Sequence, residues 1–355
     1  MSNRTFFHGF LAASLTLILV GCPGGDVTGS NSPSPSSDPA GGDDATPGAV
    51  AGLGLALSLA AMPANSWQAS SPMGQPRGGL SASAINGKIV VLGGDSDQTV
   101  ETYDPRSEAW SLVKVKTDEG MGRSFGAAMA VGGLVFYAGG TTNWDSSLLE
   151  VFNPETSTWL SYQAIYYLPA GVMALAGTAL NDSIVLLGGR NVSGLRARVD
   201  AYDVVRNEWY RPGDLPEARA GHAAATLNGR IYVAGGYTDL SGIATDSLRV
   251  MTPDGEWLDE LPGGEPPAAM LTARHSFAMA ALGGKLYVAG GIDADGNVLS
   301  SVEEYDPAAN RWTAKAPMPS ARVHLAMTAL GDRLYALGGF DADRRPVRTT
   351  EVFRP

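Results

Sequence analysis

Ile89-Val90-Val91-Leu92-Gly93-Gly94 is the first of six segments in which a short apolar run is followed by two glycines. The other five glycine doublets are Gly139-Gly140, Gly188-Gly189, Gly235-Gly236, Gly290-Gly291 and Gly338-Gly339, and the first glycines of successive doublets lie 46 to 55 residues apart. Self-similarity at such a period indicates one supersecondary unit repeated along the chain. The doublets therefore predict six copies of a single structural unit.

Each copy contains segments typical of four antiparallel strands, which we call A, B, C and D. The apolar run before each doublet predicts strand B, and a turn such as Asn86-Gly87 separates it from a strand A rich in alanine and glycine. The turn dipeptides predict type I′ hairpins, because that turn needs positive φ at both central positions. They are Asn86-Gly87, Gly132-Gly133, Asn181-Asp182, Asn228-Gly229, Gly283-Gly284 and Gly331-Asp332.

Strand C carries an aromatic residue and strand D carries a tryptophan. The aromatic residues are Tyr103, Phe152, Tyr202, Tyr305 and Phe353, with Met251 in the fourth copy. Trp110, Trp159, Trp209 and Trp312 follow seven residues later, and Trp257 follows Met251 after six. Together with the doublets and an arginine that opens most A strands, this pattern resembles the kelch repeat from about residue 67 to residue 355. The resemblance implies an all-β fold, a six-bladed kelch-type β-propeller with one repeat per blade.

The two ends of the repeat region predict how the ring closes. The last copy stops at Pro355, two residues after Phe353, and so lacks strand D. Trp67 stands ten residues before Arg77, the spacing that also separates Trp209 from Arg219 and Trp312 from Arg322. We therefore expect the segment at Trp67 to be the missing D strand of blade six, which removes exposed strand edges. The propeller is expected over residues 63–355.

The residues before the propeller predict export and a lipid anchor. Residues 1–21 have a basic start and an apolar run typical of a signal peptide, and the sequence ending at Cys22, the only cysteine, resembles the bacterial lipobox. Residues 22–49 predict a disordered tether lipidated at Cys22. The apolar segment at 50–62 alternates like a strand, either an extra strand at a blade edge or a degenerate strand C leading into Trp67. The resemblance implies a location in the outer membrane, on its periplasmic or its surface side.

The charge of the chain argues against one class of partner. Its formal net charge is −11, so it is not suited to neutralise the phosphates of nucleic acid. We expect a monomeric propeller. No catalytic, phosphate-binding or metal-ligating pattern appears in the sequence, and no cofactor is expected. His222, His275 and His324 occupy three different positions of the repeat and do not predict a repeated metal site.

Loop lengths predict which face of the propeller binds. The opening position of strand A, the Arg slot, lies 16 residues before the doublet in all six copies, whereas the B–C connections and the D–A connections vary in length. These connections share one face. Binding residues are usually carried by variable loops on a rigid scaffold. We therefore expect the B–C/D–A face to hold the ligand.

Two groups of residues on that face are candidates for ligand binding. The first consists of the arginines in the Arg slot: Arg77, Arg123, Arg219, Arg274 and Arg322, with Val172 in blade three. Five guanidinium groups near the channel mouth could bind a carboxylate or another anion. The alternative is that they pair between blades with acids two residues before the strand-C aromatic, which are Glu101, Glu150, Asp200, Glu303 and Glu351.

The second group is Asn143, Trp144 and Asp145 in the B–C loop of blade two. Trp144 is the one tryptophan outside the repeat pattern. It could stack on a sugar ring or anchor a protein partner, or it could fold back onto the blade.

Three functions remain open on the sequence alone. The first is a surface- or periplasm-facing module that binds a glycan, a peptide or a protein. The second is a sugar-modifying enzyme similar to the periplasmic sialic-acid mutarotase, although no motif beyond the generic repeat carries its catalytic residues over. The third is an envelope scaffold without a small ligand. The copper radical oxidases of similar fold need a Tyr–Cys cross-link, for which this chain keeps no cysteine once Cys22 is lipidated.

Overall fold

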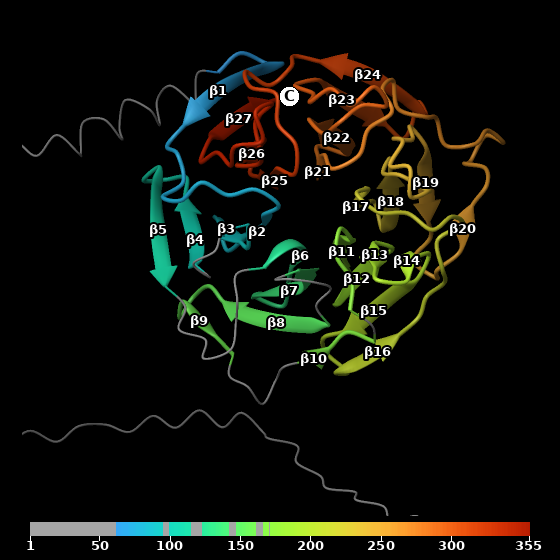
Figure 1. Ribbon diagram of the computed structural model, residues 1–355, viewed down its shortest axis with the longest axis horizontal. Coiled ribbons are helices and arrows are strands. Elements are labelled where there is room, and N and C mark those ends of the chain that lie inside the picture. Colours follow the sequence, from blue (N-terminus) through green and yellow to red (C-terminus); the bar gives the residue numbers. More distant parts are fainter. Residues whose placement is uncertain (1–61, 95–98, 115–122, 142–146, 161–165, 170) are drawn as a thin grey trace, which may run out of the picture. The chain divides into compact units, whose positions relative to one another are not determined.

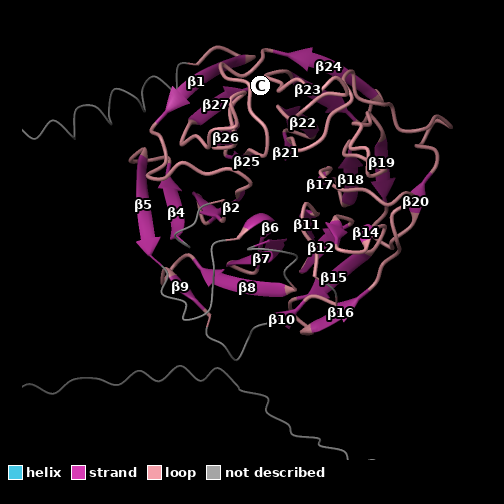
Figure 2. Ribbon diagram, viewed as in Figure 1, coloured by secondary structure: helices cyan, strands magenta, loops and turns pink. Residues whose placement is uncertain are grey.

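The computed structural model describes residues 62–94, 99–114, 123–141, 147–160, 166–169 and 171–355. The predicted signal peptide, the predicted tether with Cys22 and the apolar segment except Met62 therefore lie outside the described residues, as does the loop with Asn143, Trp144 and Asp145. The described part is built from strands and loops without a helix (Figure 2). Nothing helical in these ranges is long and apolar enough to cross a membrane.

Six antiparallel sheets form a ring around a central channel (Figure 1), which confirms the predicted six-bladed propeller. The innermost strand of each sheet is strand A, which from blade one to blade six is β2 (Ser81–Ile85), β6 (Ser124–Val131), β11 (Ala176–Leu180), β17 (Ala223–Leu227), β21 (Ala278–Leu282) and β25 (Ala326–Leu330). Strand B follows in the same order: β3 (Lys88–Leu92), β7 (Leu134–Thr141), β12 (Ser183–Leu187), β18 (Arg230–Ala234), β22 (Lys285–Ala289) and β26 (Arg333–Leu337).

The outer half of each blade consists of strands C and D. Strand C is β4 (Thr99–Asp104), β8 (Leu148–Asn153), β15 (Val199–Asp203), β19 (Leu248–Met251), β23 (Val302–Asp306) and β27 (Thr350–Arg354). Strand D is β5 (Ala109–Lys114), β9 (Thr158–Trp159), β16 (Glu208–Tyr210), β20 (Trp257–Leu258), β24 (Arg311–Lys315) and β1 (Ser66–Ser70). In blade two a second short strand, β10 (Tyr166–Tyr167), also pairs with β8. Strand D of that blade is therefore split, which the repeat pattern did not predict.

The N-terminal strand closes the ring as predicted. β1 pairs antiparallel with β27, and Trp67 stands opposite Phe353, as Trp110 stands opposite Tyr103 in blade one. Asn65, two residues before Trp67, has a φ of 54°. A positive φ also occurs two residues before each of the other five strand-D tryptophans. The first and last segments of the propeller thus form one blade, although they lie almost 290 residues apart in sequence.

The hairpins between strands A and B only partly follow the prediction. All six have two-residue loops, and in blades one, two, four and five both central residues have positive φ, as type I′ requires. In blades three and six only Asn181 and Gly331 have positive φ, while Asp182 and Asp332 do not. One positive φ at the first central position fits a type II′ turn. The type I′ prediction is wrong there because an aspartate adopts positive φ less readily than a glycine.

The doublets join each blade to the next. Both glycines of every doublet have positive φ. The N–H of the second glycine donates to the carbonyl of the Arg-slot residue in the following blade, as from Gly94 to Arg123 at 2.9 Å and from Gly339 to Arg77 at 2.8 Å. A Cβ on the first glycine would lie within 2.8 Å of that same carbonyl oxygen. Glycine is therefore needed twice over, for its φ and for the close approach of the next blade.

The strand-C aromatics and the strand-D tryptophans fill the outer core. Tyr305 and Trp312 face each other across β23 and β24 with ring centroids 5.0 Å apart, and Tyr305 also contacts Tyr232 of blade four at 6.1 Å. The indole N–H of Trp312 donates at 2.9 Å to the carbonyl of Ala268, in the connection that leads from blade four into blade five. This tilted aromatic pair thus packs within blade five, and it also contacts residues at the boundary with blade four.

Candidate functional site

The five slot arginines are buried and paired within their own blades. Arg77, Arg274 and Arg322 donate to Glu101, Glu303 and Glu351 at 2.9, 2.6 and 2.6 Å. Arg123 pairs with Glu150. Each of these four also donates to the carbonyl of the first doublet glycine of its blade. The expected ion pairs are thus present, but they lie inside blades and not between them.

Blades three and four keep the same scheme with different residues. In blade four Arg219 pairs with Glu217 at 2.9 Å, and the other carboxylate oxygen of Glu217 accepts from Arg249. In blade three, where Val172 fills the slot, Asp200 pairs with Arg198 at 2.7 Å. The slot arginines therefore stabilise the blades. An anion could bind to their guanidinium groups only by displacing the carboxylates with which they pair. Their role in ligand binding, like that of Asn143, Trp144 and Asp145, stays a prediction.

A pocket of about 570 Å³ lies at the mouth of the channel on the B–C/D–A face. We call it the mouth pocket. Its lining comes from blades two to six and includes Phe125, Thr141, Met173, Arg190, Tyr237, His275 and His324. Thr141, Arg190 and Tyr237 share one position of the repeat, directly after the doublet. Phe125 and His324 share another, two residues after the Arg slot.

A closed belt of hydrogen bonds forms the floor of the mouth pocket. The residues two positions after the Arg slot all have positive φ: Gly79, Phe125, Ala174, Gly221, Ser276 and His324. The N–H of each donates to the carbonyl of the preceding one, and the N–H of Gly79 donates to His324 at 2.9 Å, which completes the circle. Four of the six are not glycine, so their backbone is strained. Such strain is found where the surrounding structure holds it, often at functional sites.

Two belt glycines, Gly79 and Gly221, and the neighbouring Gly78 leave space for aromatic rings at the channel mouth. A Cβ on Gly79 would lie 2.7 Å from the ring of Phe125, and one on Gly78 would lie 2.2 Å from the ring of Phe340. Because blade one has no side chain there, Phe125 reaches across it to His324, with ring centroids 4.9 Å apart. Tyr237 lies against Gly221 and contacts His275 edge to face at 5.5 Å.

The two histidines of the mouth pocket are neutral near pH 7. Burial and the nearby His275 lower the pKa of His324 to about 4, and burial lowers the pKa of His275. The Nδ1 atom of His275 lies 3.0 Å from the hydroxyl of Ser276, so its other ring nitrogen remains for a ligand. Neutral imidazoles can donate or accept hydrogen bonds here.

Sequence reasoning missed this site because it looked for residues that recur in every copy. The pocket is made instead by positions whose residue varies between the copies while neighbouring positions stay fixed. Directly after the doublet the chain has Thr141, Arg190, Tyr237, Ile292 and Phe340 in blades two to six. That contrast was visible in the sequence and is the signal that could have located the mouth.

No cluster of three or more histidine, cysteine, aspartate or glutamate side chains suited to a metal ion occurs in the described ranges. His222 does not line the mouth pocket, unlike His275 and His324. It lies within the channel wall, buried, with a ring carbon that a Cβ on Gly188 would approach to 2.9 Å.

Comparison with known proteins shows that the sequence matches models of kelch-repeat families. A family model described as the KLHDC2/KLHL20/DRC7 Kelch-repeats domain matches residues 176–351, and one for the Kelch motif matches residues 76–114. Kelch-like protein 36 of Rattus norvegicus is 28% identical over 255 residues, which cover 65% of this chain and 38% of that protein. Beta-scruin of Limulus polyphemus is 31% identical over 148 residues, 39% of this chain and 15% of that protein. The chain thus spans less than two fifths of the length of these relatives.

Proposed function

Because this chain belongs to the kelch-repeat proteins and its repeats form a six-bladed propeller, we propose that it is an interaction module that binds its partner with the B–C/D–A face. The mouth pocket is the observation that carries this proposal. The backbone hydrogen bonds of its doublets and of its belt recur in every blade, whereas the side chains carried by this frame vary between blades. A rigid scaffold with variable side chains at one opening is suited to recognition.

Exposed apolar side chains around the pocket favour a peptide or protein partner. Val192 in the hairpin of β13 (Arg190–Asn191) and β14 (Gly194–Leu195) is 77% exposed. Leu240 and Ile243, in the B–C loop of blade four, are 76% and 61% exposed. Exposed large apolar residues can form a protein-binding surface where loops bring them together. A glycan remains a second class of ligand for the same face, through the aromatic rings of the pocket.

The rest of the proposal concerns where the module works. We propose that Cys22 anchors the mature protein to the outer membrane through lipid, that the propeller acts as a monomer, and that nucleic acid is not its partner. A sugar-modifying enzyme is the alternative. The neutral imidazoles of His275 and His324 favour it, since a neutral imidazole beside a pocket can accept a proton.

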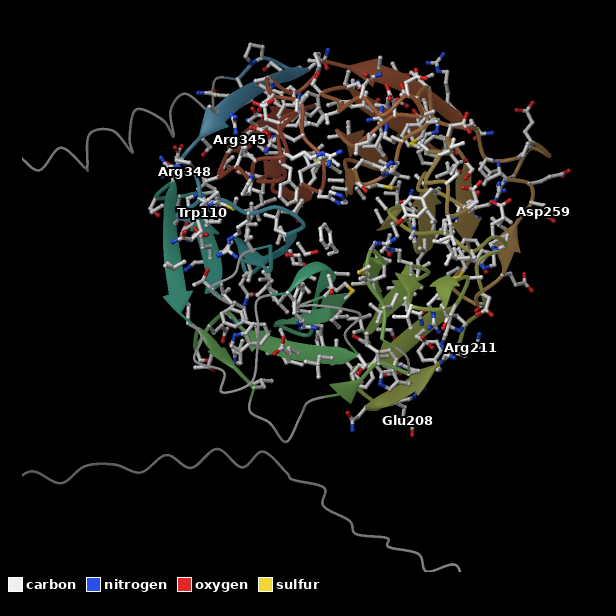
Figure 3. All side chains as sticks on the ribbon, viewed as in Figure 1. Trp110, Glu208, Arg211, Asp259, Arg345 and Arg348 are labelled. Atoms are coloured by element: carbon white, nitrogen blue, oxygen red, sulfur yellow. The ribbon has the colours of Figure 1, made fainter. Side chains whose placement is uncertain are left out.

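The test is a binding screen of the full-length protein against peptide and glycan libraries, followed by variants. Tyr237→Ala and Val192→Asp are expected to weaken a specific ligand at least about tenfold, the usual effect of losing an anchor residue. Arg211→Gln is the matched control, because Arg211 lies at the outer rim of the ring (Figure 3) and pairs only with Asp214 in the described parts of the chain. Specific binding that survives both loop variants and is lost in Arg211→Gln would contradict the proposal. The hits should also be tested for turnover, which would favour the enzyme.

A further inference from the structure

We propose that the mouth pocket takes a ring-bearing organic acid, with its carboxylate at Arg190 and its apolar or aromatic ring between Phe125 and Tyr237. This rests on the proposed function, since it names the ligand class of the same pocket. The three residues come from blades two, three and four, which are consecutive around the ring. Arg190 belongs to the middle blade, so an acid bound to it places its ring between the other two.

Arg190 is the available cation of the pocket. The slot arginines use their guanidinium groups on carboxylates and carbonyls of their own blades. Arg190, by contrast, forms no ion pair within the described ranges, and its side chain is exposed at the opening. Its backbone is fixed by two hydrogen bonds with Met173, at 2.9 and 3.0 Å. An uncommitted guanidinium carried by this fixed backbone can offer a carboxylate two parallel hydrogen bonds.

Charge around the pocket favours an anion over a cation. The chain as a whole has a formal net charge of −11, yet the described residues that line the mouth pocket include no aspartate or glutamate. With His275 and His324 neutral, Arg190 gives the described lining of this pocket a net positive charge. A concave site with one sign of charge and apolar walls concentrates the field at the ligand.

The walls beside Arg190 suit a ring and not a long flexible chain. Phe125 is held over Gly79, and Tyr237 lies against Gly221, so neither ring can move inward. Met173 and Ala174 of blade three complete an apolar surface between them. Rigid aromatic surfaces bind flat or cyclic groups at a low cost in side-chain entropy.

The opposite wall makes the binding sensitive to pH. His275 and His324 face the pocket from blades five and six, together with Tyr237 and Arg190 as the other titratable groups of the described lining. A bound carboxylate stabilises the protonated form of a nearby imidazole. By linkage, affinity for the acid should rise as the pH falls from 8 towards 5, and this rise should be smaller in His275→Gln.

The experiment is calorimetry on the full-length protein with phenylacetate and its neutral counterpart phenylacetamide as probes. The acid should bind at least about tenfold more tightly, as expected for charge-assisted hydrogen bonds. Arg190→Gln should abolish that difference. Arg196→Gln is the matched control, because Arg196 belongs to the same B–C loop but does not line the pocket. Unchanged melting temperatures would show that both variants fold.

Further probes separate the sources of such an acid. Cyclohexanecarboxylate, glucuronate and a hexapeptide ending in phenylalanine share the carboxylate beside a ring. Preferential binding of any of them through Arg190 supports the inference and identifies the source. Equal binding of acid and amide, lost in Tyr237→Ala, would overturn the anion site and leave the binding module standing. The anion site would also be overturned if no probe bound and if a partner found in the binding screen bound the Arg190→Gln variant as tightly as the native protein.

Discussion

His222 is an ionisable residue in a position that is otherwise apolar. Three residues after the Arg slot, blades one, three and six have Leu80, Leu175 and Leu325, and blade five has Phe277, all packed toward the first doublet glycine of the preceding blade. His222 fills this joint between blades three and four. Neither of its ring nitrogens has a hydrogen-bond partner among the residues that the structure describes. Its neutral form is therefore strongly favoured in the folded state.

We expect acid to unfold the propeller partly through His222. Burial and the nearby Arg219 lower its pKa to about 3, from 6.5 when unfolded. Between these values the unfolded state binds more protons, so stability falls as the pH falls, by up to about 1.4 kcal/mol per pH unit for this one group. His222→Leu should remove that part of the pH dependence and raise stability at pH 7. Denaturant unfolding of both proteins from pH 7 to pH 4 measures it. Equal slopes would contradict this account.

Between elements, the slot arginines connect parts of a blade that are distant in sequence. Arg274 precedes β21 and donates to Gly290 after β22 at 2.9 Å and to Glu303 in β23 at 2.6 Å. Its side chain is fully buried and that of Glu303 is 2% exposed. One guanidinium group thus fixes strands A, B and C at the end of the blade that borders the binding face. Burial lowers the pKa of Arg274, and the charge of Glu303 opposes this change.

Arg274→Gln is expected to destabilise the propeller by about 3–5 kcal/mol, because it leaves the carboxylate of Glu303 buried without its partner. The same change at Arg211, whose pair with Asp214 is half exposed, should cost no more than about 1 kcal/mol. Denaturant unfolding of the two variants makes the comparison. A small and equal effect at both positions would show that the buried pair contributes nothing. Arg274→Gln with Glu303→Gln should recover part of the loss.

The order of strands could be predicted from the sequence because it is repeated. Doublets, turns and tryptophans recur at nearly constant spacing, so a wrong strand assignment in one copy is corrected by the other copies. The spacing of Trp67 to Arg77 located even β1. The split strand D of blade two was not predictable, since Trp159 stands in its usual place. The sequence predicted that acidic residues would pair with the slot arginines, but it placed these pairs between blades and not within them. The spacing of residues does not show in which direction a long side chain turns.

The variable positions could have located the mouth of the channel, but the packing of its aromatic rings could not be predicted, because it depends on gaps created by other blades. Phe125 belongs to blade two but lies over blade one, where Gly78 and Gly79 leave space, and contacts His324 of blade six. No pattern within one repeat contains this information. It arises only when the ring closes.

At the scale of the whole molecule, closure of the ring depends on the joint between blades six and one, which we call the seam. Here the chain runs from β1, strand D of blade six, into blade one. At the joint between blades four and five, Asn310 accepts from the N–H of Ala268 at 2.8 Å, and at that between blades five and six Asn65 accepts from the N–H of Ala316 at 2.9 Å. Blade one has Glu108 at the equivalent position. Glu108 is buried, and neither carboxylate oxygen has a partner in the described parts of the chain. The indole contact is kept there, from Trp110 to Ser71 at 2.8 Å.

Glu108→Asn is therefore expected to stabilise the closed ring by about 1–3 kcal/mol at pH 7, because it removes a buried, unpartnered charge and introduces the asparagine contact seen at those two joints. Burial raises the pKa of Glu108, so the native chain gains stability from this group as the pH falls through that pKa, and the advantage of the variant should shrink in acid. Thermal and denaturant unfolding at pH 7 and pH 5 test both statements. Glu108→Gln separates the causes, since it removes the charge without the shorter asparagine geometry. A variant less stable than the native chain at pH 7 would show that the seam holds Glu108 by contacts of its own.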